Sequence, residues 1–273
     1  MGELKSIQIG EDIVDFEKLK KDAANDAWHF NPRNLMDVLG TTDVKQTFAK
    51  LREYTSQGDF SQLGLGDYID LPTFHDGETA YTYNPTTENL RIQIVAFDHY
   101  YRVGQQEVKT HHCVMQWKNV LRQKRLDSTN TAGGYRNTEL WNYLNGTFKS
   151  KLVEYTGIEP IGIDRLLDTR NGWNWNATGQ YEYVFIPAEA EVFNSLGWAF
   201  SGYGTGTSIQ YPLYRMWPNA RLKLYNGNRH WWWLASPSYF ASGNFCGVFK
   251  SGDSGSGVWA SLPYCGVSPC FCV

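Results

Sequence analysis

The segment from residue 230 to residue 273 constrains the fold more than any other part of the chain. Two apolar segments, residues 230–237 with three consecutive tryptophans and residues 265–273, bracket a stretch rich in Gly, Ser and aromatic side chains. We expect the apolar segments to form strands and the stretch between them, residues 238–264, to be a loop displayed on that scaffold, where binding residues concentrate. Its mixture of Tyr, Phe, Ser, Gly and Asn is also typical of antibody binding loops. The segment therefore favours a binding protein over an enzyme.

Composition narrows the class of protein and of partner. The 273 residues suffice for one large domain, alone or with a small appendage, and 42% hydrophobic residues can fill its core. The formal net charge of −3 and the lack of a long Lys/Arg run argue against nucleic acid or an anionic membrane surface as partner. We find no signal peptide and no membrane-spanning stretch, so we expect no membrane insertion. The odd number of cysteines predicts free thiols.

The N-terminal region, residues 1–62, is expected to be helical and the remainder to be α+β. One predicted helix places Ile13, Phe16 and Leu19 on one face, and a second follows an N-cap at Thr42 and ends near Gly58. Two short amphipathic helices bury little against each other, so they must pack on the main body or mediate a homo-oligomer. Beyond residue 63, we expect strands at 66–71, 90–97, 111–117 and 181–186, and helices starting near 137 and at Pro187.

A serine-protease-like pattern is present but incomplete. The sequence Gly-Asp-Ser-Gly-Ser-Gly at residues 252–257 resembles a nucleophile loop, and His111, Asp164 and Ser254 follow the order of a catalytic triad. However, only 19 residues follow Ser254, which is too few to complete the second barrel. Ser256 also stands where a glycine would help to form the oxyanion hole. A hydrolase that uses Ser254 is therefore the third hypothesis, and we expect no catalytic residues.

Other reactive side chains favour structural roles. His111 and His112 point to opposite faces of a strand, so both cannot easily reach one metal ion. Cys270 and Cys272 share one face, where we expect them to belong to the core. We expect the rings of the tryptophan run to alternate, with Trp232 facing outward or toward a neighbouring loop. No metal and no cofactor is predicted.

Two motifs resemble a known family. The segments HWWWLASP (230–237) and GVSPCFCV (266–273) resemble the "WWLRSP … GVRPAFCV" ending of a family with a C-type-lectin-like fold, common in gut bacteria and their phages. Earlier motifs of that family occur in the same order, and the resemblance covers roughly residues 63–273. It implies the formylglycine-generating-enzyme type of C-type-lectin-like fold. Many members look like variable proteins of diversity-generating retroelements, which mutate adenines in a C-terminal gene segment.

The chain also departs from this family. Ala235 and Ser268 replace the two motif arginines, and Cys270 replaces the motif alanine. The Glu-Pro-Asn and Gln-Pro-Asp motifs of calcium-dependent lectins are absent, so a calcium-dependent sugar site is not expected. Adenine mutation of Asn codons cannot produce Lys, Glu, Gln, Met or Trp. Residues 238–273 contain only Lys250 and Trp259 of these types, where the whole-chain composition predicts about seven.

The resemblance implies a variable region at about residues 235–268 that binds a protein or glycan on a cell surface. The protein would then serve in receptor recognition or adhesion, on a virion (phage tail or capsid) or a cell surface, or in the cytoplasm before assembly. The alternative is a structural virion component of the same fold without a dedicated ligand. The candidate ligand-binding residues are Ala235, Ser238, Tyr239, Phe240, Asn244, Phe245, Phe249, Ser251, Asp253, Ser254, Ser256, Trp259, Ser261 and Tyr264.

Overall fold

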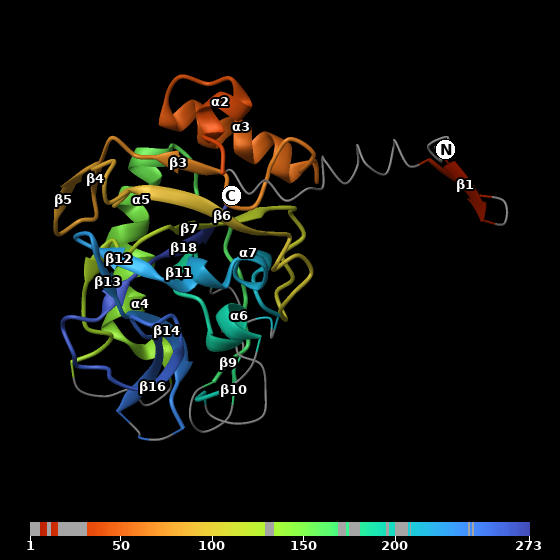
Figure 1. Ribbon diagram of the computed structural model, residues 1–273. Helices are drawn as coiled ribbons and strands as arrows, with labels where there is room; N and C mark the ends of the chain where they lie inside the picture. The colour runs from red at the N-terminus through yellow and green to blue at the C-terminus, as the bar shows by residue number, and fades with distance from the viewer. Residues whose placement is uncertain are drawn as a thin grey trace.

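The protein is a mixed α+β structure with most of its strands in two five-stranded sheets (Figure 1). The computed structural model describes residues 32–128, 134–168, 181–194, 197–199, 207, 209–239, 241 and 243–273, and the backbone of 6–9, 12–15 and 173–174; at 168 and 256 it likewise describes the backbone alone. Within these ranges, none of the helices has the length and apolar character needed to cross a bilayer.

The first sheet is antiparallel and central to the core. Its order is β11-β18-β7-β6-β3, and every neighbouring pair is antiparallel. All residues of β7 and the middle five of β6 are buried, because other elements cover both faces. The strands predicted at 66–71, 90–97, 111–117 and 181–186 are confirmed with shorter bounds. They are β3 (Tyr68–Asp70), β6 (Arg91–Phe97), β7 (Cys113–Trp117) and β11 (Val184–Phe185), and β18 (Cys270–Cys272) completes the sheet.

The second sheet has the order β16-β15-β14-β17-β8 and carries the segment predicted to be a loop. Its strands are β14 (Trp232–Pro237), β15 (Asn244–Val248), β16 (Ser254–Trp259), β17 (Gly266–Val267) and β8 (Arg122–Gln123). The prediction of an irregular loop over 238–264 is therefore wrong. Phe245, Val248 and Val258 in this segment are buried, and their spacing among small Gly and Ser residues is enough to build two strands. β16 lies at the edge of the sheet, because β15 is its sole partner among the described strands.

Both faces of β14 are buried, each against its own hydrophobic cluster. Trp233 belongs to one cluster and Trp232 to the other. The predicted alternation of the two rings is thus confirmed. Of the two predicted positions for Trp232, the outward one is wrong, and the ring instead faces a neighbouring segment, where its indole N–H donates to the Arg221 carbonyl at 2.9 Å. Alternation along a strand exposes one face only where that face is left uncovered. Cys270 and Cys272 lie with Trp232 in the second cluster, which confirms their place in the core, and burial raises the pKa of both thiols.

Two N-terminal helices pack against the main body. They are α2 (Leu35–Leu39) and α3 (Val44–Ser56), and α3 is the predicted second helix, although its N-cap is Asp43 and not Thr42. The Phe48 and Phe271 rings lie 6.0 Å apart, and the Thr55 hydroxyl donates to the Val273 carbonyl at 3.1 Å. Of the two expected alternatives, packing on the body is thus observed for α3. A homo-oligomer stays a prediction.

The first predicted helix is not observed. Residues 12–15 form a strand, β2 (Asp12–Asp15), paired antiparallel with β1 (Ser6–Ile9). The β-branched residues of both segments favour extended backbone over a helix. Phe16 and Leu19, predicted to continue that helix, lie outside the described residues.

Short helices and hairpins complete the structure. The helix predicted near 137 is confirmed as α4 (Glu139–Tyr143), which Thr138 caps by accepting the Trp141 N–H at 3.2 Å. The helix predicted to start at Pro187 begins two residues later, as α6 (Glu189–Phe193). The other elements are η1 (Tyr135–Asn137), η2 (Leu144–Phe148), α5 (Lys149–Thr156), α7 (Pro212–Met216), η3 (Pro218–Arg221), and the pairs β4 (Thr73–His75) with β5 (Ala80–Thr82), β9 (Leu167–Asp168) with β10 (Trp173–Asn174), and β12 (Lys223–Tyr225) with β13 (Asn228–His230). β14 and β16 lie at the end of the molecule opposite α2 and α3 (Figure 1).

Candidate ligand-binding surface

Four of the predicted aromatic residues are exposed at the ends of the second sheet. The exposed fractions are 50% for Tyr239, 36% for Phe249, 58% for Trp259 and 47% for Tyr264. Large apolar side chains of this kind usually occupy the interior, so several on one sheet indicate a contact surface. The polar candidates Ser251, Asp253 and Ser261 are exposed as well.

Four predicted residues do not belong to this surface. Ala235, Ser238, Asn244 and Phe245 are buried, so their predicted role in direct ligand contact is wrong. The physical reason is the pairing of this segment: the Ser238 N–H donates to the Asn244 carbonyl at 3.0 Å, which draws both residues into the sheet. Phe240 and the side chain of Ser256 lie outside the described residues.

The exposed aromatic residues form two groups, one at each end of β14–β16. At one end, the Phe249 ring lies 6.2 Å from the Trp231 ring and covers Gly255, where a Cβ would overlap the Phe249 ring. Tyr264 is tied to the same end, because its carbonyl lies 2.8 Å from Nε2 of His230, the residue before Trp231.

At the other end, the Tyr239 ring stacks on the Trp198 ring at 6.1 Å. The Trp259 ring lies against Gly243, which precedes β15. At about 3.3 Å per residue, the six residues of β16 separate the two groups by about 20 Å.

A buried carboxylate fastens this surface to the rest of the molecule. Glu189, at the start of α6, is fully buried and accepts the Ala199 N–H at 2.8 Å and the Trp198 N–H at 3.1 Å on Oε2. The Ser254 hydroxyl donates to Oε1 of the same carboxylate. In addition, the Trp198 indole N–H donates to the Ser254 carbonyl at 3.2 Å. Ser254 therefore has an anchoring role, and sequence reasoning missed its partner Glu189, because 65 residues separate them and no motif links them.

The residues of the protease-like pattern have separate partners. Nδ1 of His111 pairs with Asp98 at 2.6 Å, and Asp164 accepts the backbone N–H of Gln105 at 2.9 Å. The Ser254 hydroxyl is bonded to Glu189, so it lacks the hydrogen bond to a histidine that activates a serine nucleophile. In the described ranges, no group of three or more His, Cys, Asp or Glu side chains is placed to hold a metal ion.

A buried ionic cluster joins α6 to the segments around residues 165 and 182. The Arg165 guanidinium donates to Glu182 at 2.8 Å and to Glu191 at 3.0 Å, and all three side chains are fully buried. Burial opposes the ionisation of Glu191, but the charge of Arg165 and the hydrogen bonds from His99 and the Ala188 N–H together outweigh it and keep the pKa of this carboxyl below its usual value. Sequence reasoning did not single out these residues, because their contacts join separate segments of the chain.

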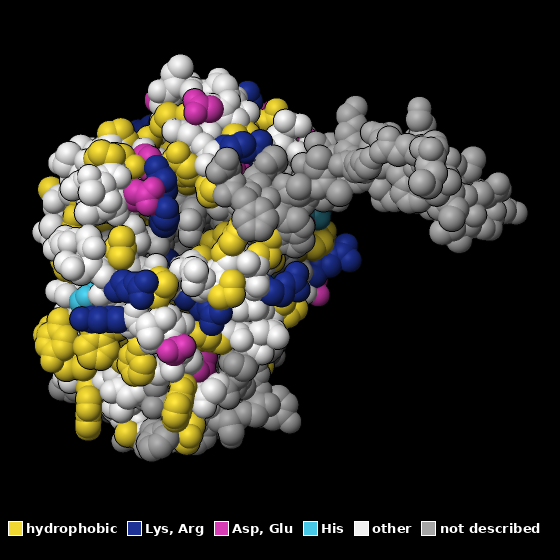
Figure 2. Space-filling model, viewed as in Figure 1, with side chains coloured by type: hydrophobic (Ala, Val, Ile, Leu, Met, Phe, Trp, Pro, Cys, Tyr) yellow, Lys and Arg dark blue, Asp and Glu magenta, His cyan; other side chains and the backbone are white. Residues whose placement is uncertain are grey.

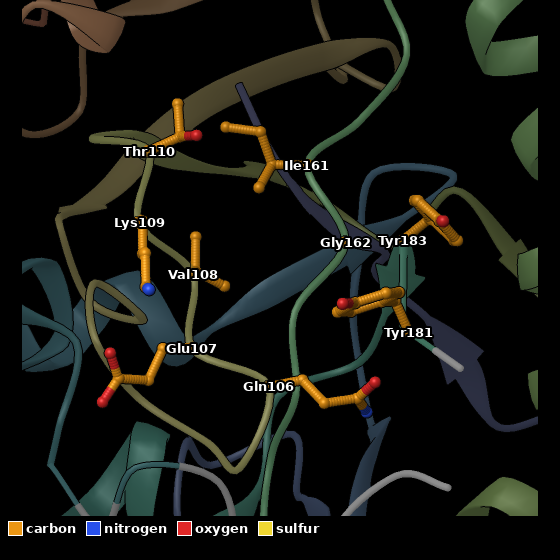
Figure 3. A pocket seen from close by; sticks show the side chains of 9 residues that line it. All are labelled: Gln106, Glu107, Val108, Lys109, Thr110, Ile161, Gly162, Tyr181 and Tyr183. Carbon is orange, nitrogen blue, oxygen red and sulfur yellow. The ribbon is translucent and has the colours of Figure 1, made fainter. Parts of the chain in front are cut away.

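A small pocket lies apart from this surface (Figure 3). Its volume is about 240 Å³, below the usual range of ligand pockets. Tyr181 and Tyr183 lie on one side of the backbone at Gly162, where a Cβ would come within 2.6 Å of the Tyr181 side chain. The side chains of Glu107 and Lys109 extend away from the two tyrosines. None of the residues that line this pocket belongs to the predicted variable region.

Comparison with known proteins gives one match. The model of the family described as a domain of unknown function, DUF6273, matches residues 110–273, which is more than half of the chain. No curated protein and no solved structure matches. The matched range includes both aromatic groups and Glu189, but not α2, α3 or β6, which contribute to the same core.

Proposed function

The chain belongs to the DUF6273 family, and we propose that it is a ligand-binding protein whose contact surface consists of the exposed side chains at the two ends of β14–β16. The observation that carries this proposal is the exposure of Tyr239, Phe249, Trp259 and Tyr264 beside β14 and β15, whose residues are all buried. Aromatic residues held on a rigid support provide large contact areas at low entropic cost, which is how binding loops obtain affinity.

We further propose that the fold is the formylglycine-generating-enzyme type of the C-type-lectin-like fold and that a diversity-generating retroelement varies the surface. The support is the resemblance of the motifs at 230–237 and 266–273, which bracket the exposed residues. The partner would be a protein or glycan on a cell surface, and the protein would act on a virion or a cell. Ala235, Ser238, Asn244 and Phe245 would then be framework positions.

A binding experiment tests the main proposal. The labelled full chain is applied to an array of defined glycans and purified bacterial surface proteins, beside the double variants F249S/Y264S and Y239S/W259S. I209S is the matched control, because Ile209 is 61% exposed and lies outside the surface. We expect at least one double variant to lose binding by about tenfold or more, with I209S unchanged. Equal binding by all four proteins, or no binding by the parent, would contradict the proposal.

Comparison of related gene copies tests the retroelement. If adenine-directed mutation varies this surface, the copies will differ at codons for Tyr239, Ser251, Asp253 and Tyr264 while the buried framework codons stay the same. Differences spread evenly over exposed and buried positions, or outside adenine-containing codons, would reject it.

A further inference from the structure

The C-terminal part of the chain is basic although the whole protein is acidic. Residues 207–273 contain five Lys or Arg and one Asp, a net charge of +4 in a chain whose net charge is −3. The basic residues are Arg215, Arg221, Lys223, Arg229 and Lys250. This segment also holds most of the exposed surface described above, so the charge asymmetry coincides with it.

None of these basic residues forms a salt bridge among the described residues, although the formal count includes Lys223, whose pKa burial lowers to about 7. Elsewhere, Arg91 pairs with Asp70 at 2.8 Å and Arg122 with Asp76 at 2.8 Å. By contrast, none of the five basic residues of 207–273 has a carboxylate within 4.0 Å in the part of the chain that the structure describes. Lys223 is buried, but Arg229 and Lys250 are exposed. Two accessible cations are thus free to pair with an external anion.

Both cations adjoin the aromatic group formed by Phe249, Trp231 and Tyr264. Arg229 lies in β13, one residue before His230 and two before Trp231, and Lys250 directly follows Phe249. The contact between the Trp231 and Phe249 rings brings these two segments together. Figure 2 shows Lys/Arg side chains and a histidine beside hydrophobic side chains over the region of β12–β14, with few acidic side chains near them.

We propose that this end of the surface binds an acidic glycan, a polysaccharide whose sugar rings carry carboxylates. This inference rests on the proposed function and names its ligand class. Exposed aromatic rings stack on the flat faces of sugars, and Arg and Lys pair with the carboxylates. Nucleic acid fits less well, because its charge density calls for many cations and the remainder of this chain is acidic.

The test uses the full chain and immobilised polygalacturonate, with its methyl-esterified form as a neutral polymer of the same backbone. We expect the parent to bind the acid form, to bind it less as salt rises, and not to bind the ester. The variant R229Q/K250Q should weaken binding by about tenfold, which corresponds to about 1.4 kcal/mol. The matched control is K45Q/K109Q, because Lys45 and Lys109 are exposed and lack a carboxylate partner among the described residues; it should bind within about twofold of the parent.

Several outcomes would overturn the inference: no binding to the acid polymer, equal binding to the ester, an equal loss in K45Q/K109Q, or binding to poly-glutamate or DNA in place of polygalacturonate. Any of these leaves the proposed function intact if the F249S/Y264S or Y239S/W259S variant still loses binding to another ligand on the array. Failure of the proposed function itself is recognised by unchanged binding of both of those variants.

Discussion

Strands β14 and β16 lie in one sheet, two positions apart, and use their side chains in opposite ways. Every residue of β14 is buried, and its two tryptophans fill two different clusters. β16 begins with the half-buried Ser254, continues through Gly255 and Gly257, and ends at the exposed Trp259. Trp232 and Trp259 are thus the same residue type in two roles. The comparison indicates that the side chains of β14 build the core, whereas β16 and the turns beside it carry the candidate ligand-binding surface.

The largest difference in the free energy of unfolding is expected between substitution of a buried tryptophan and substitution of an exposed one. Trp233→Ala should lower the free energy of unfolding by about 4 kcal/mol, because it leaves a cavity and removes the indole donor that bonds to the Lys124 carbonyl at 2.8 Å. Trp259→Ala should change it by less than about 0.5 kcal/mol. Urea denaturation of both variants measures the difference, and similar losses would mean that β16 also supports the core.

The next largest effect on stability is expected at Glu189, whose carboxylate links the candidate surface to α6. Glu189→Gln replaces one acceptor oxygen by a donor beside the Ser254 hydroxyl and the N–H groups of Trp198 and Ala199. We expect a loss of about 2 kcal/mol and faster hydrogen exchange at the amides of Trp198 and Ala199. Ser254→Ala removes a single bond and should cost about 1 kcal/mol. Unchanged exchange in the Gln variant would show that the carboxylate is not the anchor.

The buried Lys223 should make stability depend on pH. Burial lowers the pKa of its ammonium to about 7 from 10.5, even though Nζ donates to the carbonyls of Trp117 and Lys118 at 2.9 and 3.0 Å. Above pH 7 this side chain therefore binds more protons in the unfolded chain than in the folded one, so its contribution to the free energy of unfolding should rise with pH, by up to about 1.4 kcal/mol per unit.

Denaturation of the parent and of Lys223→Met at about pH 7 and pH 8.5 isolates the contribution of Lys223. The five buried thiols begin to ionise in the unfolded chain over the same range and lower the stability of both proteins alike, so the quantity to compare is the difference between the two proteins. The parent should gain stability relative to the Met variant between the two pH values, and the variant leaves the Trp117 carbonyl bonded to the Ser268 hydroxyl at 2.8 Å. An equal pH dependence in both proteins would assign it to other groups.

The smallest effects are expected at the exposed aromatics. Tyr239→Ser and Tyr264→Ser should each lower the free energy of unfolding by about 1 kcal/mol or less, because about half of each residue stays exposed and only its remaining contacts, such as the stacking of Tyr239 on Trp198, are lost. Calorimetry of the single variants tests this directly. A much larger loss of stability at either position would mean that the residue supports the folded structure, as the residues of β14 do.

The sequence predicted element types where a pattern is local. The alternation at 90–97 predicted a strand and the apolar periodicity after residue 137 predicted a helix, because both patterns are encoded by neighbouring residues. The alternation of Trp232 and Trp233 was predicted correctly, but the sequence left open whether Trp232 faces solvent or a neighbouring segment, because burial on both faces of β14 depends on distant segments. Phe245 was taken for a surface residue because its Gly and Ser neighbours hid a strand.

For the surface itself, local composition identified the right stretch but not which of its residues are accessible. Tyr239, Phe249, Trp259 and Tyr264 are exposed as expected, whereas Ala235, Ser238, Asn244 and Phe245 are not. Glu189 could not have been found, because its role depends on a contact across 65 residues. The absence of salt bridges at Arg229 and Lys250 likewise becomes visible only when the carboxylates of the described residues have positions.

The bond from Glu189 to Ser254, together with backbone pairing of β16 to β15, has a consequence for how this protein can change. Backbone hydrogen bonds between strands do not depend on side-chain identity, and the side chains of Glu189 and Trp198, which hold Ser254, lie before the predicted variable region. A short stretch of gene can therefore be rewritten repeatedly at its exposed codons while the architecture is inherited intact, provided that the serine at its start is kept.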